Sequence, residues 1–539
     1  MKYFGWIFLF FIMVYIVPLG SRPMLAPQEF TNAETAREML LNKSVSVPVL
    51  LGETDVIMPM NYWLSAGSFK LFGENAFANR LPSALAVGLT ALLLALLVQQ
   101  TLRNEKLAAL AAMIYMSSSL VYSIGTLALS TNVFVMFITG ASGLFFLSQQ
   151  EPKFNRRKFL LLLLCGISVG LAFLTKGIIA FAVAGLIYGV FLICKRKWLD
   201  LFIIPVIIFI FAALTIAPWG AVVLKKFPDA ASIIWQDFAE FFVSDSSYGK
   251  INTWYYYLPL LIIGLMPSGL LIPAAGAEGR DAWKKLFSQP LFQFCICALI
   301  VPLVFFSAIP VKHSGYTLLC FPSAAILIAA GVQLYFNAGG HHRSYNWVMN
   351  IWGFLLLAGG MALIAVSYLN IPQASEFVSK LHFSELVLVT LGIAAAVGGI
   401  LILYSLRGNW RSRLYLFFFG ISLLPLSISW CVKPNSRMPE QIIASVIAEN
   451  DLKPQKMLIV SSHRLAPAVA WTAKNDQVKI ISDEKCCDRV ILPEELKEIM
   501  KKNGTPVMLV LYSADKMWSQ FPDNKNIKTV NEISFLLLD

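Results

Sequence analysis

The sequence predicts an all-α polytopic membrane protein that carries a small C-terminal α/β domain. Three observations lead to this fold class. The chain of 539 residues is 57% hydrophobic and 14% charged, whereas soluble proteins carry roughly 25% charged residues. Apolar runs of about 20 residues, each long enough to cross a bilayer core of about 30 Å, recur along the chain. From about residue 434 the charge rises, and short strand-like and helix-like runs alternate instead.

Thirteen apolar segments are predicted to span the membrane. They lie near residues 3–20, 80–100, 107–124, 127–148, 158–174, 177–194, 198–217, 254–275, 290–308, 315–336, 347–369, 384–406 and 413–431. Lys and Arg concentrate in alternate short loops, which is the pattern of loops on the cytoplasmic side. This charge pattern places the N-terminus in the cytoplasm. An odd number of spans then places residues 434–539 on the opposite side, in the periplasm. The net charge of +12 reflects this topology, and contact with acidic lipids explains it better than nucleic-acid binding.

The predicted transmembrane domain, residues 1–433, includes two long outer loops at 21–79 and 219–253. The second of these loops contains aromatic and aliphatic residues at near-helical spacing. Both loops are therefore predicted to hold amphipathic helices that lie in the plane of the membrane interface.

The first outer loop is predicted to contain two helices. Thr31-Asn32-Ala33-Glu34 has the pattern of a capping box, with Thr31 as N-cap and Glu34 as its partner, so a helix is expected to follow through Leu41. Its apolar face would comprise Ala33, Ala36 and Leu40. A second short helix is expected from about residue 61 to 71.

Residues 434–539 are predicted to form the periplasmic α/β domain. Apolar runs typical of buried strands lie at residues 457–460, 478–481 and 507–512. Helical patterns lie at residues 465–473 and 493–502, and Pro493 suits the first turn of a helix.

Charged residues cluster near the outer ends of the predicted spans. They are Glu29, Glu34, Arg37, Glu38, Arg80, Lys176, Lys312 and His313. Charges at membrane depth are costly and tend to be functional. An outer cavity lined with cations would suit the phosphate of a lipid whose tail stays in the bilayer. Nucleotide-binding loops, zinc-protease motifs and nucleophile elbows are absent from the sequence, which disfavours ATP-driven transport and hydride transfer.

A set of short motifs resembles the GT-C glycosyltransferases, in particular the protein mannosyltransferase superfamily and its bacterial 4-amino-4-deoxy-L-arabinose lipid A transferases. The matching stretches are Pro27-Gln28-Glu29 through Leu40, Pro59 with Tyr62-Trp63-Leu64, Phe69 to Gly73, Asn79-Arg80-Leu81-Pro82-Ser83, Leu174-Thr175-Lys176-Gly177, Ala217-Pro218-Trp219, Trp254-Tyr255-Tyr256, and Lys312 with Tyr316 and Cys320. They occur in order along the whole chain, and it is their combination that is specific.

The resemblance implies a GT-C fold and a transfer of sugar from a polyprenyl-phosphate donor to a cell-envelope acceptor (a lipid A-like lipid, a glycan or a protein) at the outer face. It implies Glu29 as the catalytic carboxylate, with Gln28 as a hydrogen-bonding neighbour that positions substrate. The donor phosphate would contact Arg80, Lys176, Lys312 and Tyr316, and the substrate cavity would include Arg37, Asp55, Tyr62, Asp237 and His313. The resemblance fixes no cofactor, although it leaves a divalent metal open.

Four positions depart from the family pattern. Gln28 stands where relatives have Asp, and an amide cannot act as a general base near neutral pH. Ser130 replaces a second family Asp, Phe238 stands where the arabinose enzymes have His, and the stretch before Pro59 lacks the family Lys.

These substitutions motivate an alternative function, in which the chain is a catalytically inactive relative that binds a lipid-linked sugar or supports envelope assembly. A transporter is disfavoured, because the sequence has no inverted repeats, no broken-helix signals and no charges in the middle of the spans. For individual residues a structural role competes with the functional one. Glu29 could be a solvated residue near a helix start, Arg37 an ion-pair partner within the loop, and Lys176 and Lys312 interfacial anchors.

Overall fold

The computed structural model describes residues 2–25, 27–43, 46–51, 53–54, 56–240, 242, 254–270, 284, 286–337, 343–369, 385–404, 439–450, 452–475, 478–482, 490–501, 506–513, 515, 518, 527–530 and 533–538. The chain divides into two compact units. The helical unit comprises residues 1–19 and 83–432, and the mixed unit comprises residues 20–82 and 433–539. The first outer loop thus belongs to the same compact unit as the C-terminal residues.

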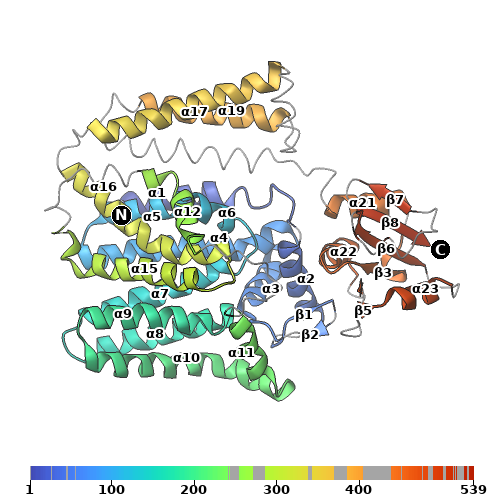
Figure 1. The fold of residues 1–539 in the computed structure, drawn as a ribbon, viewed down its shortest axis with the longest axis horizontal. Coiled ribbons are helices and arrows are strands. Elements are labelled where there is room, and N and C mark those ends of the chain that lie inside the picture. The colour runs from blue at the N-terminus through green and yellow to red at the C-terminus, as the bar shows by residue number, and fades with distance from the viewer. Residues whose placement is uncertain are drawn as a thin grey trace. The chain divides into compact units, whose positions relative to one another are not determined.

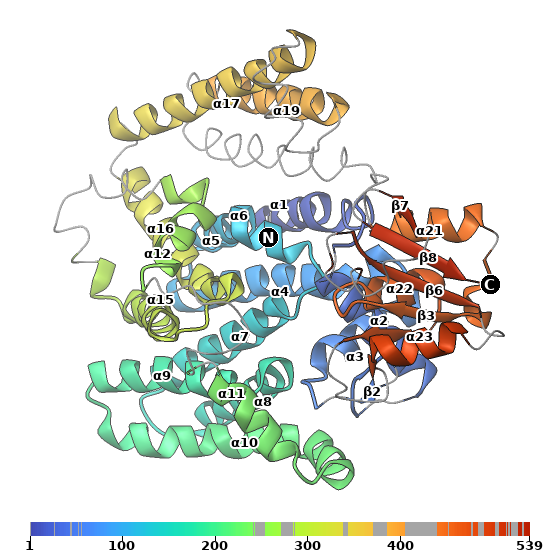
Figure 2. The same ribbon diagram turned by 45° about the vertical axis from the view of Figure 1, so that its right-hand side comes forward.

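The helical unit is built from helices (Figure 1), many of them apolar. Its elements are α1 (Lys2–Phe11), η1 (Ile12–Ile16), α4 (Ala76–Leu102, from Ser83 onward), α5 (Glu105–Ser117), α6 (Ser119–Gly125), α7 (Thr131–Gln150), α8 (Arg156–Lys176), α9 (Ile179–Cys194), α10 (Trp198–Lys226), α11 (Ala230–Glu240), α12 (Tyr257–Gly264), η2 (Ser268–Leu270), α15 (Pro290–Ala308), η3 (Ser314–Cys320), α16 (Phe321–Asn337), α17 (Arg343–Leu369) and α19 (Glu385–Tyr404). Figures 1 and 2 both show α8 beside α10, and α17 beside α19.

Small residues allow close helix packing at these pairs. A Cβ added at Gly166 of α8 would lie 2.7 Å from the Ile208 carbonyl oxygen of α10, and one at Gly360 of α17 would lie 2.5 Å from that of Gly392 of α19. Because lipid tails are as apolar as Leu, such close backbone contact is a main source of helix association in a bilayer.

Seven helices of the described residues are long and apolar enough to cross a membrane, and the bent pair α5–α6 would make an eighth. Three shorter apolar helices lie at Gly5–Ile16, Ile179–Cys194 and Val389–Tyr404. The prediction of a mostly helical membrane protein is confirmed. The span predicted near 413–431 lies outside the described residues.

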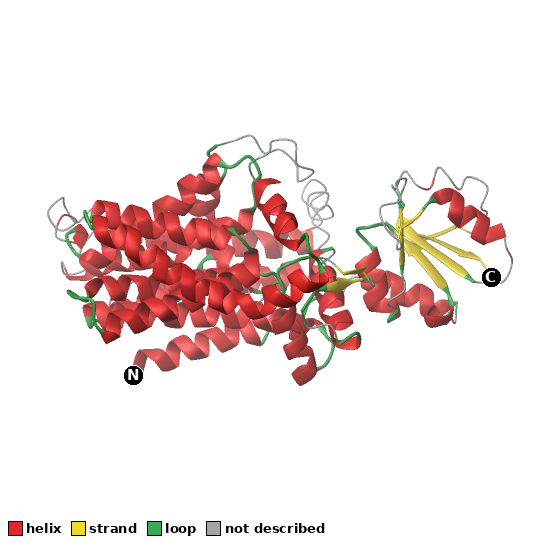
Figure 3. Ribbon diagram, turned by 90° about the horizontal axis from the view of Figure 1, so that it is seen from below, coloured by secondary structure: helices red, strands yellow, loops and turns green. Residues whose placement is uncertain are grey.

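The mixed unit contains two helices from the first outer loop and a six-stranded sheet. Its elements are α2 (Gln28–Leu41), β1 (Val49–Leu50), β2 (Glu53–Thr54), α3 (Met60–Phe72), the start of α4, α21 (Pro439–Glu449), η5 (Pro454–Lys456), β3 (Leu458–Ser461), α22 (Ala466–Ala473), β4 (Lys479–Ile481), β5 (Val490–Ile491), α23 (Pro493–Lys501), β6 (Val507–Tyr512), β7 (Ile527–Val530) and β8 (Ile533–Leu538). Figure 3 shows the sheet strands in yellow.

The sheet has the strand order β5-β4-β3-β6-β8-β7. The strands β5, β4, β3 and β6 run parallel, and β8 pairs antiparallel with both β6 and β7. Helices cover both faces. Residues of α21 and α22 pack on the face that includes Ile459 and Met508, while Leu496 of α23 packs on the face that includes Val460 and Leu509. Burial on both faces explains why these strands are continuous apolar runs.

One apolar core joins the first outer loop to the sheet. Phe30, Ala33 and Ala36 of α2 and Phe69 of α3 belong to the same buried cluster as Trp471 of α22. The predicted apolar face of the first loop helix is confirmed, since Ala33 and Ala36 are fully buried and Leu40 packs against the cluster.

The predicted capping box is wrong. The helix α2 begins at Gln28, three residues before the predicted cap, and the Thr31 hydroxyl donates to the Pro27 carbonyl oxygen at 3.0 Å. The Glu34 carboxylate pairs with Arg37 instead of the backbone at Thr31. The chain entering α2 is held by Glu29, whose carboxylate accepts a hydrogen bond from the Leu25 backbone N–H at 2.8 Å.

Candidate functional site

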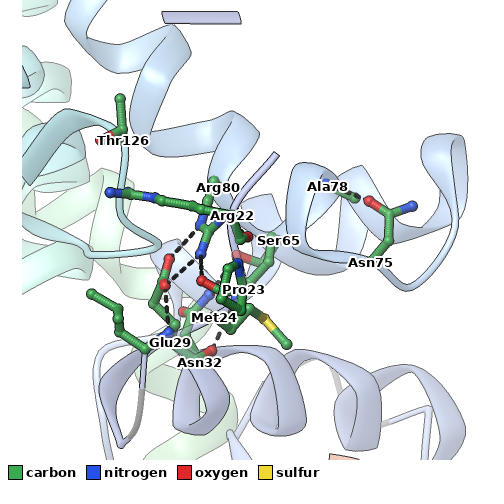
Figure 4. A network of polar contacts seen from close by, with 12 residues as sticks. Arg22, Pro23, Met24, Glu29, Asn32, Ser65, Asn75, Ala78, Arg80 and Thr126 are labelled. Atoms are coloured by element: carbon green, nitrogen blue, oxygen red, sulfur yellow. Dashed lines mark hydrogen bonds and ion pairs between the residues drawn. The ribbon is translucent and has the colours of Figure 1, made fainter. Parts of the chain in front are cut away.

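One set of predicted charged residues lies on α2 and at the start of α4, and we call it the first-loop group: Glu29, Glu34, Arg37, Glu38 and Arg80. Its centre is an ion pair between Glu29 of α2 and Arg80 of α4. The guanidinium donates from Nε to Glu29 Oε1 at 2.7 Å and from Nη2 to Glu29 Oε2 at 2.8 Å (Figure 4). Arg80 also donates to the carbonyl oxygens of Arg22 and Pro23, at 2.8 and 2.7 Å. The exposed fraction is 1% for Glu29 and 0% for Arg80. Such a two-point contact fixes the relative orientation of two elements as well as their distance.

A network of hydrogen bonds between buried amides also connects α2, α3 and α4. The Asn32 amide donates to Asn79 Oδ1 at 2.7 Å and to Ser65 Oγ at 2.9 Å, and it accepts from the Asn61 amide. The Asn79 amide donates to the Glu29 carbonyl oxygen at 3.0 Å. Helices α2, α3 and α4 are thus tied by polar contacts that leave their buried amides satisfied.

The other acids of α2 also have partners within the loop. The Arg37 guanidinium donates to both carboxylate oxygens of Glu34, one of them at 2.9 Å, and Glu38 accepts from the Leu51 backbone N–H at 2.7 Å. Burial raises the pKa of Glu34, and the bond from Arg37 opposes that rise. Arg37 is therefore an ion-pair partner of Glu34, and it is only 4% exposed.

Gln28 differs from its neighbour, because it is exposed at the first position of α2. Helix N-termini carry unsatisfied backbone N–H groups and a partial positive charge, which favours anions nearby. Tyr62 is half-buried on α3, and Asp237 is exposed on α11 of the helical unit. Asp55 lies outside the described residues.

The second group of predicted site residues lies where α15 is followed by η3 in the helical unit. The Lys312 ammonium donates to three carbonyl oxygens at the end of α15, those of Phe306 at 2.9 Å, Ser307 at 2.6 Å and Ile309. An ammonium has three N–H donors, so all three are used in capping this helix end. The rule that Lys and Arg bind the last carbonyls of a helix explains the position.

His313 is held beside this cap by its backbone. Its N–H donates to the Tyr257 hydroxyl at 3.0 Å, and its ring lies 5.7 Å from the ring of Tyr316. Tyr316 in turn stacks on Phe306 with ring centroids 4.5 Å apart. Desolvation, helped by the positive charge of Lys176, lowers the pKa of His313. The structure therefore brings Lys176, Lys312, His313 and Tyr316 together, and we call these four residues the lysine–histidine group.

Sequence reasoning missed Tyr257 and Phe306, which hold this group. Tyr257 directly follows Trp254-Tyr255-Tyr256, so the neighbouring motif was a signal for it. Phe306 had no signal beyond its apolar helix. No carboxylate of the described residues forms an ion pair with Lys176.

Metal ligands do not gather in the part of the chain that the structure describes. There, no three His, Cys, Asp or Glu side chains lie so that they could hold a metal ion. Of the substituted family positions, Ser130 is the residue before the first turn of α7, and Phe238 packs against Trp235 on α11 with ring centroids 5.8 Å apart.

Comparison with known proteins decides the family. The dolichyl-phosphate-mannose-protein mannosyltransferase family model matches residues 7–233. An undecaprenyl phosphate-alpha-4-amino-4-deoxy-L-arabinose arabinosyl transferase of Edwardsiella ictaluri (strain 93-146) is 30% identical over 483 residues, which cover 88% of this chain and 86% of the relative. The chain belongs to this arabinosyl transferase family. The corresponding transferase of Aeromonas salmonicida (strain A449) is 28% identical over 535 residues, which are 95% of each chain.

The fold agrees with that membership. ArnT from Cupriavidus metallidurans, solved bound to undecaprenyl phosphate, superposes with a TM-score of 0.78 over 99% of this chain and 98% of that one, at 18% sequence identity. The protein is thus a GT-C membrane glycosyltransferase of the class that uses a polyprenyl-phosphate sugar donor. It is a multi-pass protein of the inner membrane.

Proposed function

We propose that this arabinosyl transferase family member moves 4-amino-4-deoxy-L-arabinose from undecaprenyl phosphate to an ionised oxygen of an envelope acceptor, at the outer face of the inner membrane. The names of its relatives support the donor. The distribution of Lys and Arg supports a cytoplasmic N-terminus and a periplasmic domain at residues 434–539. Labelling of a cysteine introduced at the exposed Lys453 by a membrane-impermeant thiol reagent tests that orientation.

The lysine–histidine group is assigned to the donor phosphate. Lys176 is a cation without a carboxylate partner among the described residues, and His313 lies within range of its charge. A phosphate anion would supply the missing counter-charge through charge-assisted hydrogen bonds. Lys312 contributes by its charge and by holding the turn, because its three donors are already bound to α15.

The first-loop group is assigned to positioning. Glu29 accepts hydrogen bonds from Arg80 and from the Leu25 N–H, so its carboxylate is committed to holding α2 and α4. We therefore propose that Glu29 and Arg80 orient the start of α2, and that Gln28 is the residue of the pair that meets substrate. This division differs from the expectation that Glu29 acts as catalytic carboxylate and Arg80 as a phosphate ligand.

The observation that supports an ionised acceptor oxygen is the exposed amide of Gln28, which cannot act as a base. The reaction breaks the bond from the anomeric carbon to the donor phosphate, which leaves with the electron pair, and forms a bond from that carbon to an acceptor oxygen. A hydroxyl acceptor needs a base to take its proton. A phosphate oxygen needs none, because phosphate monoesters are already ionised near neutral pH, with a second pKa of about 6.

The test is transfer by the purified protein in lipid vesicles. Undecaprenyl phosphate-linked aminoarabinose is supplied with a glycolipid that bears a phosphate, or with the same glycolipid after dephosphorylation, and products are identified by mass spectrometry. We expect sugar on the phosphate-bearing acceptor and release of undecaprenyl phosphate. Sugar on the dephosphorylated acceptor at the same rate would overturn the acceptor class, and donor binding without any product would favour the inactive relative.

A further inference from the structure

Besides the shared apolar core, Trp471 near the end of α22 and Lys474 just after it contact the first outer loop. The Trp471 ring lies 5.7 Å from the ring of Phe69 of α3, and both side chains are buried. Lys474, which directly follows α22, lies with its Nζ 4.1 Å from the centroid of the Trp471 ring and 2.8 Å from Glu74 Oε2. A cation over the face of Trp is the strongest of the cation–π pairs.

Lys474 has a left-handed backbone conformation at the C-terminal end of α22. Its φ is +51° and its ψ is +39°, in the left-handed region that Gly and Asn favour at helix ends. A non-glycine residue there is strained, and such residues persist when the surrounding contacts over-determine them. The side chains of Lys474 and Glu74 are 46% and 36% exposed, so their ion pair is a surface contact that acts together with the contact to Trp471.

Glu74 lies at the point from which α4 starts. Asn75 caps the first turn of α4, where its Oδ1 accepts from the Ala78 N–H at 2.9 Å. That same turn carries Asn79 and Arg80, which bind the backbone and the carboxylate of Glu29. Glu74 is therefore close in the sequence to the side chains that hold the start of α2.

A second charged residue of the C-terminal domain, Glu440, interacts with the start of α4. Burial raises the pKa of Glu440 of α21, and the positive charges of Arg80 and Lys474 oppose that rise. An acid, Glu440, and a base, Lys474, of the C-terminal domain thus both interact with residues at the beginning of α4.

From this chain of contacts we propose that Trp471 and Lys474 are positioning residues for sugar transfer. They hold the start of α4, and through Arg80 and Glu29 they hold the end of α2 that presents Gln28. The C-terminal domain is then a working part of the transferase and not an appended module. This inference rests on the proposed function, because it concerns the geometry of the same transfer.

The experiment is charge reversal across the Lys474–Glu74 contact in the full-length protein. Lys474→Glu and Glu74→Lys are measured singly and together, with Lys453→Glu as the control. Lys453 is an exposed lysine of the same domain. It precedes the start of β3, whereas Lys474 and α22 follow the end of that strand. All rates are measured well below the unfolding temperature of each variant, so that unfolding does not lower the measured kcat.

We expect each single reversal to lower kcat about tenfold, because small misplacements of positioning elements carry large rate penalties. KM for the donor should change little, and the double reversal should recover most of kcat. Lys453→Glu should match the wild type. Full kcat in both single variants, or a double variant as impaired as the singles, would overturn the proposal.

A second readout keeps the two proposals distinguishable. Hydrogen–deuterium exchange at residues 28–41 should rise in each single variant and return in the double variant. Loss of transfer in the wild type itself would remove the proposed function but leave this exchange result to decide whether the contact holds α2. Trp471→Phe, which keeps an aromatic face, should retain more activity than Trp471→Ala.

Discussion

The first-loop group buries its charges, whereas Lys176 and Lys312 of the lysine–histidine group are half-buried, and the two groups also satisfy their charges differently. In the first-loop group each cation meets an acid of the same loop, as Arg80 meets Glu29 and Arg37 meets Glu34. In the lysine–histidine group the ammonium of Lys312 is bound by carbonyl oxygens, and Lys176 meets no acid among the described residues. Charge that the protein neutralises by itself builds a scaffold, whereas charge left without a counter-ion attracts an anionic ligand.

The largest effect is expected from Arg80→Met. The substitution leaves the Glu29 carboxylate buried without its cation, and breaking a buried pair in this way costs about 3–5 kcal/mol. Thermal unfolding of the purified protein measures the loss. Lys70→Met is the matched control, because Lys70 is exposed on α3 of the same unit. The scaffold assignment fails if Arg80→Met unfolds at the wild-type temperature, and the double variant with Glu29→Met should regain part of the stability.

A smaller loss is expected from Lys312→Met. The three carbonyl oxygens at the end of α15 lose their donor, and hydrogen bonds to a charged group together with the helix dipole account for about 1–2 kcal/mol. Thermal unfolding again provides the measurement. A much larger fall in donor affinity than in stability would show that Lys312 contacts the phosphate directly, contrary to its role as a helix cap.

The pH dependence of donor binding sharpens the comparison further. Because the pKa of His313 is lowered from 6.5 by desolvation and by Lys176, its ring is neutral at pH 7. Lowering the pH below 6.5 charges the ring, and the stability of the ligand-free protein should fall as it does so. The phosphate of undecaprenyl phosphate also takes up a proton near pH 6, so the measured quantity is the affinity of the wild type divided by that of His313→Asn at each pH. This ratio should rise severalfold as the pH falls from 7, and a ratio that stays constant would contradict the assignment.

The smallest effect is expected from Glu440→Gln. Burial raises the pKa of Glu440 above 4.5, so the folded protein binds a proton more readily than the unfolded chain. Stability contributed by this group is present at low pH and falls as the pH rises from about 4.5 through the raised pKa. The glutamine removes this dependence, so the variant should gain stability relative to the wild type as the pH rises to 7. Unfolding curves at pH 4 and 7 compare the two proteins.

Local patterns predicted much of the fold. The predicted strand at 507–512 and the predicted helices at 465–473 and 493–502 agree with β6, α22 and α23 to within a residue at each end. These elements are set by continuous apolar runs and by Pro493, which are visible within a few residues. The predicted start of α2 was wrong because the first turn is held by contacts of Glu29 and Pro27 and not by a Thr31 cap. Glu29 accepts from the Leu25 N–H, and the Thr31 hydroxyl donates to the Pro27 carbonyl oxygen.

The partners of the site residues were harder to predict. Glu29 and Arg80 are 51 residues apart in the sequence, and nothing local shows that they pair. The contact of Lys474 with Glu74 joins residues 400 positions apart. The role of Lys312 could have been found, because it follows the end of α15 by four residues and basic residues commonly cap helix C-termini.

The most direct test of the difference between the two groups is the binding of undecaprenyl phosphate by Lys176→Gln and by Glu29→Gln. Both variants are measured in the same detergent at a temperature where each remains folded. The account predicts that Lys176→Gln weakens binding about tenfold, since a hydrogen bond to a charged group contributes about 1.5–3 kcal/mol, and that Glu29→Gln binds within about twofold of the wild type while unfolding at a lower temperature. Wild-type binding by Lys176→Gln together with lost binding by Glu29→Gln would contradict it.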